Sequence, residues 1–385
     1  MNFELTEEQN ELKRAAHEFA EKEFKPEIAR EYDRKEEFPA DLYKKAAKLG
    51  FIGLRFAEEY GGQGYGHFEN LLVTEEFCRA DSSLGHALSS GILGSDYILL
   101  HGNEEQKKKY LSKVARGEWM AAGAITEPAH GCDIATLSTT GKHDGNDWIL
   151  NGTKTFITHS SIADFAVIVV QTNPELKHRG QTLFIVEKGT EGFESTELRG
   201  KMGIRATPVG ELSLNNVKVE EEAIVGEENR GFYHTLTTLD VGRIMAAGRA
   251  MGMAQGAYER ALKYSKERTQ YGHPISDFQA IQHKLAEMAT QIEASRQLTY
   301  QAAWCIGKEK LHFRTISKLC SMAKLLASNT AVSVTSEALQ IFGGYGYFAE
   351  YDIERYYRDV RVTQIYEGTN EIQKGNIYGS ISQGY

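Results

Sequence analysis

The sequence is poor in proline and cysteine and has no long apolar run. It holds only six prolines and four cysteines among its 385 residues. The cysteines (Cys78, Cys132, Cys305 and Cys320) are scattered without CxxC spacing, which argues against a disulfide framework or a zinc site and favours a reducing compartment. No apolar stretch reaches the roughly 20 residues that a membrane-spanning helix needs. We therefore expect neither membrane insertion nor a bound metal.

The charge balance and the missing motifs narrow the function further. A net charge of -9 argues against a general nucleic-acid binder. There is no P-loop, HExxH or GxSxG motif, so nucleophilic and metal-dependent hydrolysis lack a signature. The acidic segment 1–8 has no signal-peptide core. We expect a cytoplasmic protein of a bacterium or archaeon.

The first third of the chain, residues 1–117, is typical of a helical domain. Thr6 and Gln9 match a capping box at the start of the first helix. A second helix is expected after Pro39, and apolar residues at helical spacing predict two more over 68–78 and 84–100.

Residues 118–228 change to short β-prone runs separated by turn residues such as Asn151-Gly152. Strands are predicted over 121–126, 148–150, 154–158, 165–172, 182–187 and 211–219. Their spacing indicates an antiparallel β-sandwich or barrel of about a hundred residues.

Helical periodicity returns in residues 229–385, where Pro274 is the last proline. Helices are predicted over 231–269, 277–307, 313–342 and from 370 onward, which favours a four-helix bundle. The fold class is therefore mainly α with a β domain: an N-terminal helical domain, a middle β domain and a C-terminal bundle.

One segment near the C-terminus carries a candidate base. Glu367 stands between Tyr366, an aromatic wall, and Gly368, which lets a bulky group approach the backbone. Thr369 and Asn370 are good N-caps for the last helix. A carboxylate held this way suits proton abstraction in a pocket. From these residues alone, a solvated turn before a helix is the commoner explanation.

Three other segments are equally ambiguous by themselves. Residues 123–133 leave a strand with free backbone N–H groups and the Thr126 hydroxyl, and also fit a plain loop. Arg268 could bind a diphosphate or simply stabilise a helix C-terminus. The glycines of 340–347 could admit a phosphate or merely cap a helix.

Together, in this order and spacing, these segments resemble the flavin-dependent acyl-CoA dehydrogenase family across nearly the whole chain. The motifs that carry the resemblance are Thr126-Glu127-Pro128 with Gly131 and Asp133, the strand 154–158, and segments 201–205, 268–272, 340–346 and 366–370. The short-chain, butyryl-CoA-dehydrogenase-like branch is the nearest in character. The resemblance implies a homotetramer and a role in fatty acid metabolism.

The resemblance also implies FAD between the β domain and the bundle. Ile125, Thr126 and Thr158 would contact the flavin ring, and Thr369 and Glu371 would close over it. The rest of the cofactor would be held by further residues, some across a subunit interface. The full set implied for the cofactor is Ile125, Thr126, Phe156, Thr158, Arg268, Gln270, Phe278, Gln340, Gly344, Thr369 and Glu371.

In the reaction that the resemblance implies, Glu367 removes the α proton of an acyl-CoA thioester while a hydride leaves the β carbon for the flavin. The product is a 2-enoyl-CoA, and electrons pass to an electron-transferring flavoprotein. Some branches carry the base just before the arginine that matches Arg243. That residue is Gly242 here, which supports Glu367. The residues implied for the substrate are Ser90, Cys132, Asp240, Arg243, Tyr366 and Gly368.

Several departures from the family pattern leave the substrate open. His130, Cys132 and His159 replace more usual residues near the expected flavin. Asp96 is an acid among apolar residues, either packed against a partner or placed in the acyl pocket of a cyclic or unusual substrate. No arginine or lysine lies between residues 81 and 101, so a dicarboxylic substrate is not expected. Acyl length and the direction of flux stay open.

Two rival functions belong to other classes. One is a lyase-like relative such as an acyl-CoA desulfinase, which retention of Glu367 argues against. The other is a non-catalytic CoA- or flavin-binding module, which the intact motifs argue against.

Overall fold

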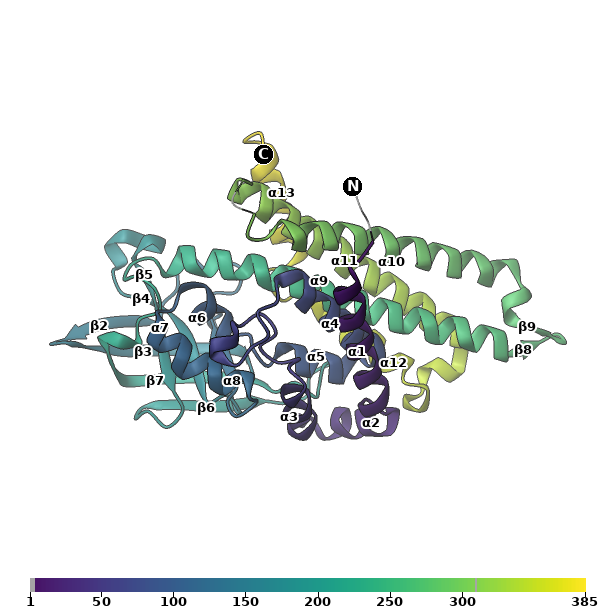
Figure 1. Cartoon of the computed structure of the whole chain (residues 1–385), viewed down its shortest axis with the longest axis horizontal. Helices are drawn as coiled ribbons and strands as arrows, with labels where there is room; N and C mark the ends of the chain where they lie inside the picture. The colour runs from purple at the N-terminus through teal and green to yellow at the C-terminus, as the bar shows by residue number, and fades with distance from the viewer. Residues whose placement is uncertain (1–3, 309) are drawn as a thin grey trace.

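The computed structural model describes residues 4–308 and 310–385, so the first three residues of the acidic N-terminal segment lie outside it. The N-terminal part is helical, as expected (Figure 1). Thr6 and Gln9 form the predicted capping box. The helices are α1 (Glu7–Glu23), α2 (Pro26–Lys35), α3 (Ala40–Lys48), α4 (His67–Ala80), α5 (Ser82–Ser90), α6 (Ser95–His101), α7 (Glu104–Gln106) and α8 (Ser112–Ala115).

The single helix predicted over 84–100 is wrong in one respect, because the chain breaks it into α5 and α6. Gly91 and Gly94 occupy the break. A Cβ on Gly94 would lie 2.3 Å from the Ala122 carbonyl oxygen, and one on Gly91 would lie 2.3 Å from the Tyr43 ring. Gly94 therefore lets the turn pack against the first strand of the sheet, and Gly91 lets it pack against α3, which periodicity alone does not reveal.

The middle part is a curled seven-stranded sheet with the order β1-β4-β2-β3-β7-β6, and β5 pairs with β4. Most pairs are antiparallel, as predicted, but β1 and the start of β2 both pair with β4 in parallel. The runs 148–150 and 154–158 are one strand whose register shifts near Gly152. The strands are β1 (Ala121–Ala124), β2 (Thr140–Asp144), β3 (Asp147–Thr158), β4 (Phe165–Gln171), β5 (Gln181–Glu187), β6 (Phe193–Leu198) and β7 (Val209–Glu220).

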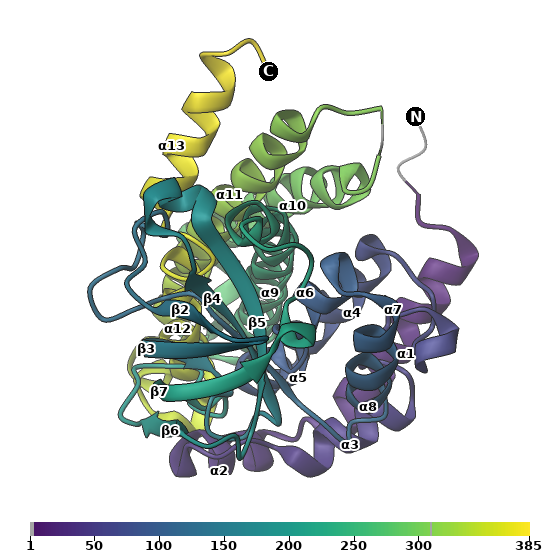
Figure 2. The same cartoon turned by 90° about the vertical axis from the view of Figure 1, so that its left-hand side faces the viewer.

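The C-terminal part is built on long helices that extend away from the sheet, and Figure 2 looks along them from the sheet end. Its elements are α9 (Gly231–Glu267), β8 (Thr269–Gln270), β9 (His273–Pro274), α10 (Gln279–Cys305), α11 (Phe313–Phe342), α12 (Ile353–Val360) and α13 (Asn370–Ile381). At 1.5 Å per residue, the 37 residues of α9 span about 55 Å. The alanines along α9 are buried and allow close helix contact.

Three apolar clusters form the core. One joins the N-terminal helices to a face of the sheet, one fills the opposite face, and one lies between α4 and the C-terminal helices. The junction of these parts is where segments distant in sequence meet. None of the helices in the described ranges is long and apolar enough to cross a membrane.

A buried ion pair fixes the loop that follows β1. Lys154 of β3 is fully buried and donates to Glu127 Oε1 at 2.8 Å and to the Ile125 carbonyl at 3.1 Å. The Glu127 carboxylate also accepts from Ser138 and from the Thr139 N–H. Burial opposes ionisation, but Lys154 and these hydrogen bonds outweigh it and lower the pKa of Glu127 to about 2.

We predict that Glu127→Gln destabilises the protein, because it leaves the Lys154 ammonium buried without its counter-charge. Losing one partner of such a pair costs about 3–5 kcal/mol in the free energy of unfolding, which urea denaturation at neutral pH measures. The native protein should also lose stability as the pH falls from about 4.5 towards 2, and the variant should lose less. Equal stability of Glu127→Gln and the exposed control Glu194→Gln would contradict this account.

Candidate active site

The Glu367 carboxylate is presented by a strained turn. Glu367 and Gly368 both have left-handed backbones, with φ of 55° and 84°. A non-glycine residue in this region is strained and persists only where its surroundings hold it. Lys324 Nζ of α11 donates to the Gly368 carbonyl at 2.8 Å, and Gln373 Nε2 of α13 donates to the carbonyls of both turn residues, at 3.0 and 2.8 Å. Two helices therefore hold the turn.

The start of α13 is tied to α11 by the same neighbourhood. Thr369 is the N-cap and accepts from the Ile372 N–H, as the sequence predicts. The Asn370 side chain bonds Ser328 and receives the second hydrogen bond from Lys324. Thr369 thus begins the helix, and Asn370 anchors the start of the helix to α11.

Glu367 points at helix α9. A Cβ on Gly242 would lie 2.2 Å from Glu367 Oε2, a distance that real contacts do not reach. The glycine therefore does more than leave the alternative base position empty. Its missing side chain is the space that the Glu367 carboxylate fills.

The electrostatic surroundings set the basicity of Glu367. Burial raises its pKa above the ordinary carboxyl value, and Asp96 adds to that effect. The cations Arg249, Arg243 and Lys324 pull the pKa down. The result is a carboxylate more basic than a solvated one, as proton abstraction requires.

The residues expected to bind the substrate come from this turn, from α9, from the loop after β1 and from α5. Arg243 is buried and donates to Asp240 Oδ1 at 2.5 Å, and Ser317 of α11 donates to the same carboxylate oxygen. Cys132 is exposed and its sulfur lies 3.9 Å from Thr369 Oγ1. The Ser90 hydroxyl is buried and donates to carbonyls of its own helix.

The residues expected to bind the flavin fall into two separate groups. The first joins the loop after β1 to β3, where the Thr155 N–H donates to the Thr126 carbonyl. Phe156 has a φ of 57° and is 68% exposed, so a large ring is held out at a strained position. Ile125, Thr126 and Thr158 are half-buried, and the Cys132–Thr369 contact brings this loop to the start of α13.

The second group lies at the far end of the bundle. The Arg268 guanidinium is 5.1 Å from the centre of the Tyr345 ring, so the end of α9 meets the turn after α11. Gln270 and Gln340 are exposed there, Phe278 is 37% exposed, and nothing lies within 4 Å of a Cβ on Gly344. Figure 1 shows β8 and β9 at the end of the molecule opposite the sheet.

The two groups cannot hold one cofactor within one chain. Gly242, which touches Glu367, and Arg268 are 26 positions apart along α9, about 39 Å along the helix axis. Exposed polar and aromatic side chains at both ends fit a flavin ring at one end and the rest of a dinucleotide at the other. The two groups would form a single cofactor site only if the group around Arg268 came from a second copy of the chain.

Sequence reasoning missed three side chains of the site. Lys324 and Gln373, which hold the turn, sit on ordinary helical patterns and carry no local signal. Arg249 lies at 1% exposure on α9 and donates to the Ser89 hydroxyl and carbonyl. The sequence signal for Arg249 is its position among small and apolar residues on what the periodicity predicts to be a buried helix face.

The residues that depart from the family pattern have defined contacts in the structure. Asp96 forms a buried ion pair with Arg55, which explains an acid among apolar residues by a structural partner. Burial raises the pKa of Asp96 despite that pairing. His159 is buried with a φ of 62°, and its ring lies edge-on to Phe38. His130 contacts the Thr136 hydroxyl in the loop after β1. No group of three or more potential metal ligands occurs among the described residues.

Comparison with known proteins identifies the class, an oxidoreductase of three domains. The family descriptions that match are the acyl-CoA dehydrogenase N-terminal domain over residues 6–118, the middle domain over 122–217 and the C-terminal domain over 229–381. The chain belongs to the acyl-CoA dehydrogenase family.

Individual relatives cover nearly the whole chain. A 3-(aryl)acrylate reductase of Clostridium sporogenes is 43% identical over 96% of this chain and 97% of its own. The caffeyl-CoA reductase–Etf complex subunit CarC of Acetobacterium woodii is 41% identical over 97% of this chain and 98% of its own. The structure of butyryl-CoA dehydrogenase from Megasphaera elsdenii superposes with a TM-score of 0.94, at 38% identity over 99% of this chain and 100% of that one.

We predict that Gly242→Ala displaces the Glu367 carboxylate, because the added methyl would occupy its position. The rate of flavin reduction by an acyl-CoA should fall about 100-fold, the scale of a misplaced catalytic group, and stopped-flow absorbance measures it. Gly379→Ala in α13 is a matched control, since its Cβ meets nothing within 4 Å. Parent-like rates in Gly242→Ala would show that the carboxylate is not confined by α9.

Proposed function

We propose that this protein is an FAD-dependent acyl-CoA dehydrogenase that converts an acyl-CoA thioester to the 2-enoyl-CoA. The observation that carries the proposal is the Glu367 carboxylate, held against Gly242 by a strained and clamped turn and made more basic by burial. A solvated turn would connect the same two segments without backbone strain or a buried carboxylate. The strained arrangement therefore indicates a function.

The chain's own residues divide the work of the reaction. Glu367 accepts the α proton of the thioester. Among the residues that the structure describes, the Glu367 N–H meets no backbone or side-chain acceptor, so it is free to donate to the thioester oxygen as negative charge develops there. Tyr366 walls the site, and Arg243 with Asp240 borders the CoA side. Bound FAD supplies the acceptor for the β hydride.

We further propose that the active unit is an oligomer, as a homotetramer would provide. The far group at Arg268 and Gly344 completes the site of a second copy, which explains why one chain carries both halves about 39 Å apart. An electron-transferring flavoprotein is the proposed acceptor, in keeping with the Etf complex named for the Acetobacterium woodii relative. The proposed domains are 1–117, 118–228 and 229–385.

The rival functions differ in two simple observations. A yellow purified protein separates a flavin enzyme from an empty CoA-binding module. Bleaching of the flavin by butanoyl-CoA separates a dehydrogenase from a desulfinase-like lyase, and the presence of Glu367 favours the dehydrogenase.

We predict that Glu367→Gln keeps FAD bound but slows flavin reduction by several powers of ten, because a positioned base is replaced by a group that cannot take the proton. Anaerobic stopped-flow with butanoyl-CoA measures the rate, and the visible spectrum measures bound flavin. Glu228→Gln, an exposed position, is the control. Bleaching of Glu367→Gln at the parent rate would remove Glu367 from the mechanism.

The pH dependence provides a separate check. Glu367 must be ionised to accept a proton, and burial raises its pKa. The rate of flavin reduction should therefore rise with pH and level off at a pH above the ordinary carboxyl range. Stopped-flow traces from about pH 4 to pH 8 would show this rise. A flat profile, with flavin bound throughout, would contradict a carboxylate base.

A further inference from the structure

One buried cation beside the site has no salt-bridge partner. Four arginines are buried in the described part of the chain. Three of them form ion pairs: Arg55 with Asp96, Arg243 with Asp240, and Arg355 with Asp81. The fourth, Arg249, forms none with any described residue. It donates to the Ser89 hydroxyl at 3.0 Å and to the Ser89 carbonyl at 2.9 Å, and the Tyr366 hydroxyl lies beside it. An unpaired buried charge is costly, so its retention calls for a function.

Arg249 occupies the same face of α9 as the site. It is seven residues, nearly two turns, beyond Gly242, which places its Cα about 10 Å along the helix from the Glu367 contact. Its charge acts on Glu367, Tyr366 and His86. Its hydrogen bonds to Ser89 place the guanidinium against α5, the helix whose His86 ring stacks on Tyr366.

The wall between Glu367 and Arg249 carries further unused polar atoms. The His86 ring of α5 stacks on the Tyr366 ring, with centroids 5.8 Å apart and planes at 19°. The Tyr366 hydroxyl and His86 Nε2 are both buried without a hydrogen-bond partner in the described part of the chain. His86 Nδ1 faces the Thr207 hydroxyl, which can donate to it and leave the ring proton on Nε2. These atoms, with the cation, suit a ligand rich in acceptor oxygens.

The charges of the site favour an anionic ligand over a neutral one. Arg243 is matched by Asp240, and Asp96 by Arg55. Lys324 bonds only neutral oxygens, those of Gly368 and Asn370. The charge of Lys324 is matched by two nearby carboxylates, Glu367 and Glu371. Arg249 is then the buried cation of the site without an ion-pair partner among the described residues. An added carboxylate would pair with it, and a planar guanidinium is well suited to bind one.

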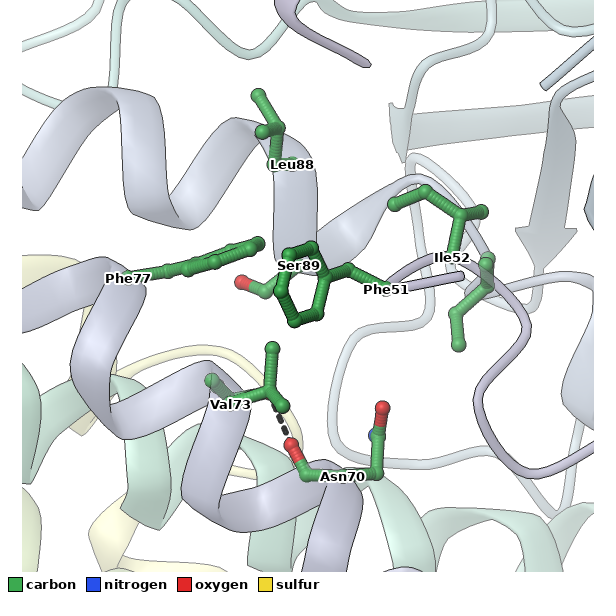
Figure 3. A pocket seen from close by; sticks show the side chains of 9 residues that line it. Phe51, Ile52, Asn70, Val73, Phe77, Leu88 and Ser89 are labelled. Carbon is green, nitrogen blue, oxygen red and sulfur yellow. Dashed lines mark hydrogen bonds between the residues drawn. The ribbon is translucent and has the colours of Figure 1, made fainter. Parts of the chain in front are cut away.

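The space behind Arg249 is small. Ser89, which anchors Arg249, also lines a cavity between α4 and α5, together with Phe51, Phe77 and Leu88 (Figure 3). That cavity measures about 10 Å³, which is room for about one water molecule. Beyond Ser89, this region is therefore filled by side chains, and it offers no room for an extended apolar chain.

We propose that Arg249 binds a carboxylate at the far end of the acyl group, and that the substrate is the CoA thioester of a short dicarboxylic acid. The proposal rests on the dehydrogenase function argued above. It replaces the expectation from the sequence that a dicarboxylic substrate is disfavoured: α5 has no cation of its own, but the fold brings one to it from α9.

The test compares binding of acyl groups of equal length with and without the second carboxylate. The Glu367→Gln holoenzyme, which binds without turnover, is titrated by calorimetry with succinyl-, glutaryl- and adipoyl-CoA against butanoyl-, pentanoyl- and hexanoyl-CoA. We expect one dicarboxylic thioester to bind more tightly than its partner of equal length. Adding Arg249→Met should reduce that preference about 100-fold, and Arg249→Lys should retain part of it.

Arg260→Met is the matched control, because it removes an arginine from the same helix outside the site and should leave the preference unchanged. Should Arg249→Met fail to fold, Ser89→Ala, which removes one anchor of the guanidinium, should weaken the preference several-fold. The Glu367→Gln holoenzyme with Arg249 intact also tests the proposal, because it must itself bind a dicarboxylic thioester more tightly than the monocarboxylic thioester of equal length.

Three results would overturn the proposal: no preference for any dicarboxylic thioester, a preference that survives Arg249→Met, or tighter, Arg249-dependent binding of 3-(4-hydroxyphenyl)propanoyl-CoA, which would assign the arginine to a phenolic oxygen. None of them touches the dehydrogenase function. That function fails separately, if no acyl-CoA bleaches the flavin of the native enzyme.

Discussion

The contact between the Glu367 carboxylate and the bare backbone of Gly242 is the constraint on which the site depends. It requires α9 to present a glycine, α11 to present Lys324, and α13 to present Gln373, all at one turn. A left-handed glutamate is unfavourable by itself, and these partners offset that cost. The C-terminal helices therefore serve as a clamp for one side chain as much as a support for the fold.

Buried ion pairs fix other segments of the molecule to one another. The Glu127–Lys154 pair holds the loop after β1 to the sheet, and the Arg355–Asp81 pair joins α12 to the start of α5. Removing either partner of such a pair leaves a buried charge without its counter-ion, which destabilises the contact between the two segments. Arg249 differs from these cations, because it has hydrogen bonds to Ser89 but no salt-bridge partner among the described residues.

The sequence predicts the architecture well where the periods are long and uninterrupted. The helix expected over 313–342 has those bounds, and the capping residues Thr6 and Thr369 act as predicted. It fails at the glycine turn between α5 and α6, because close packing against β1, and not local propensity, breaks the helix there. The sequence also does not predict the direction of strand pairing, because the parallel pairing of β1 with β4 depends on which strand edges meet in space.

The sequence by itself determined the family motifs and the three-part order of the chain, because each motif lies within a few consecutive residues. It also predicted Glu367 as the base, because Gly242 has no side chain that could take a proton. Only the tertiary structure decided what surrounds the carboxylate. Lys324 and Gln373 become clamps, Asp96 a structural partner of Arg55, and Arg249 an unmatched cation facing α5. These roles depend on distances between helices that no local pattern encodes, and on the high cost of burying a charge away from water.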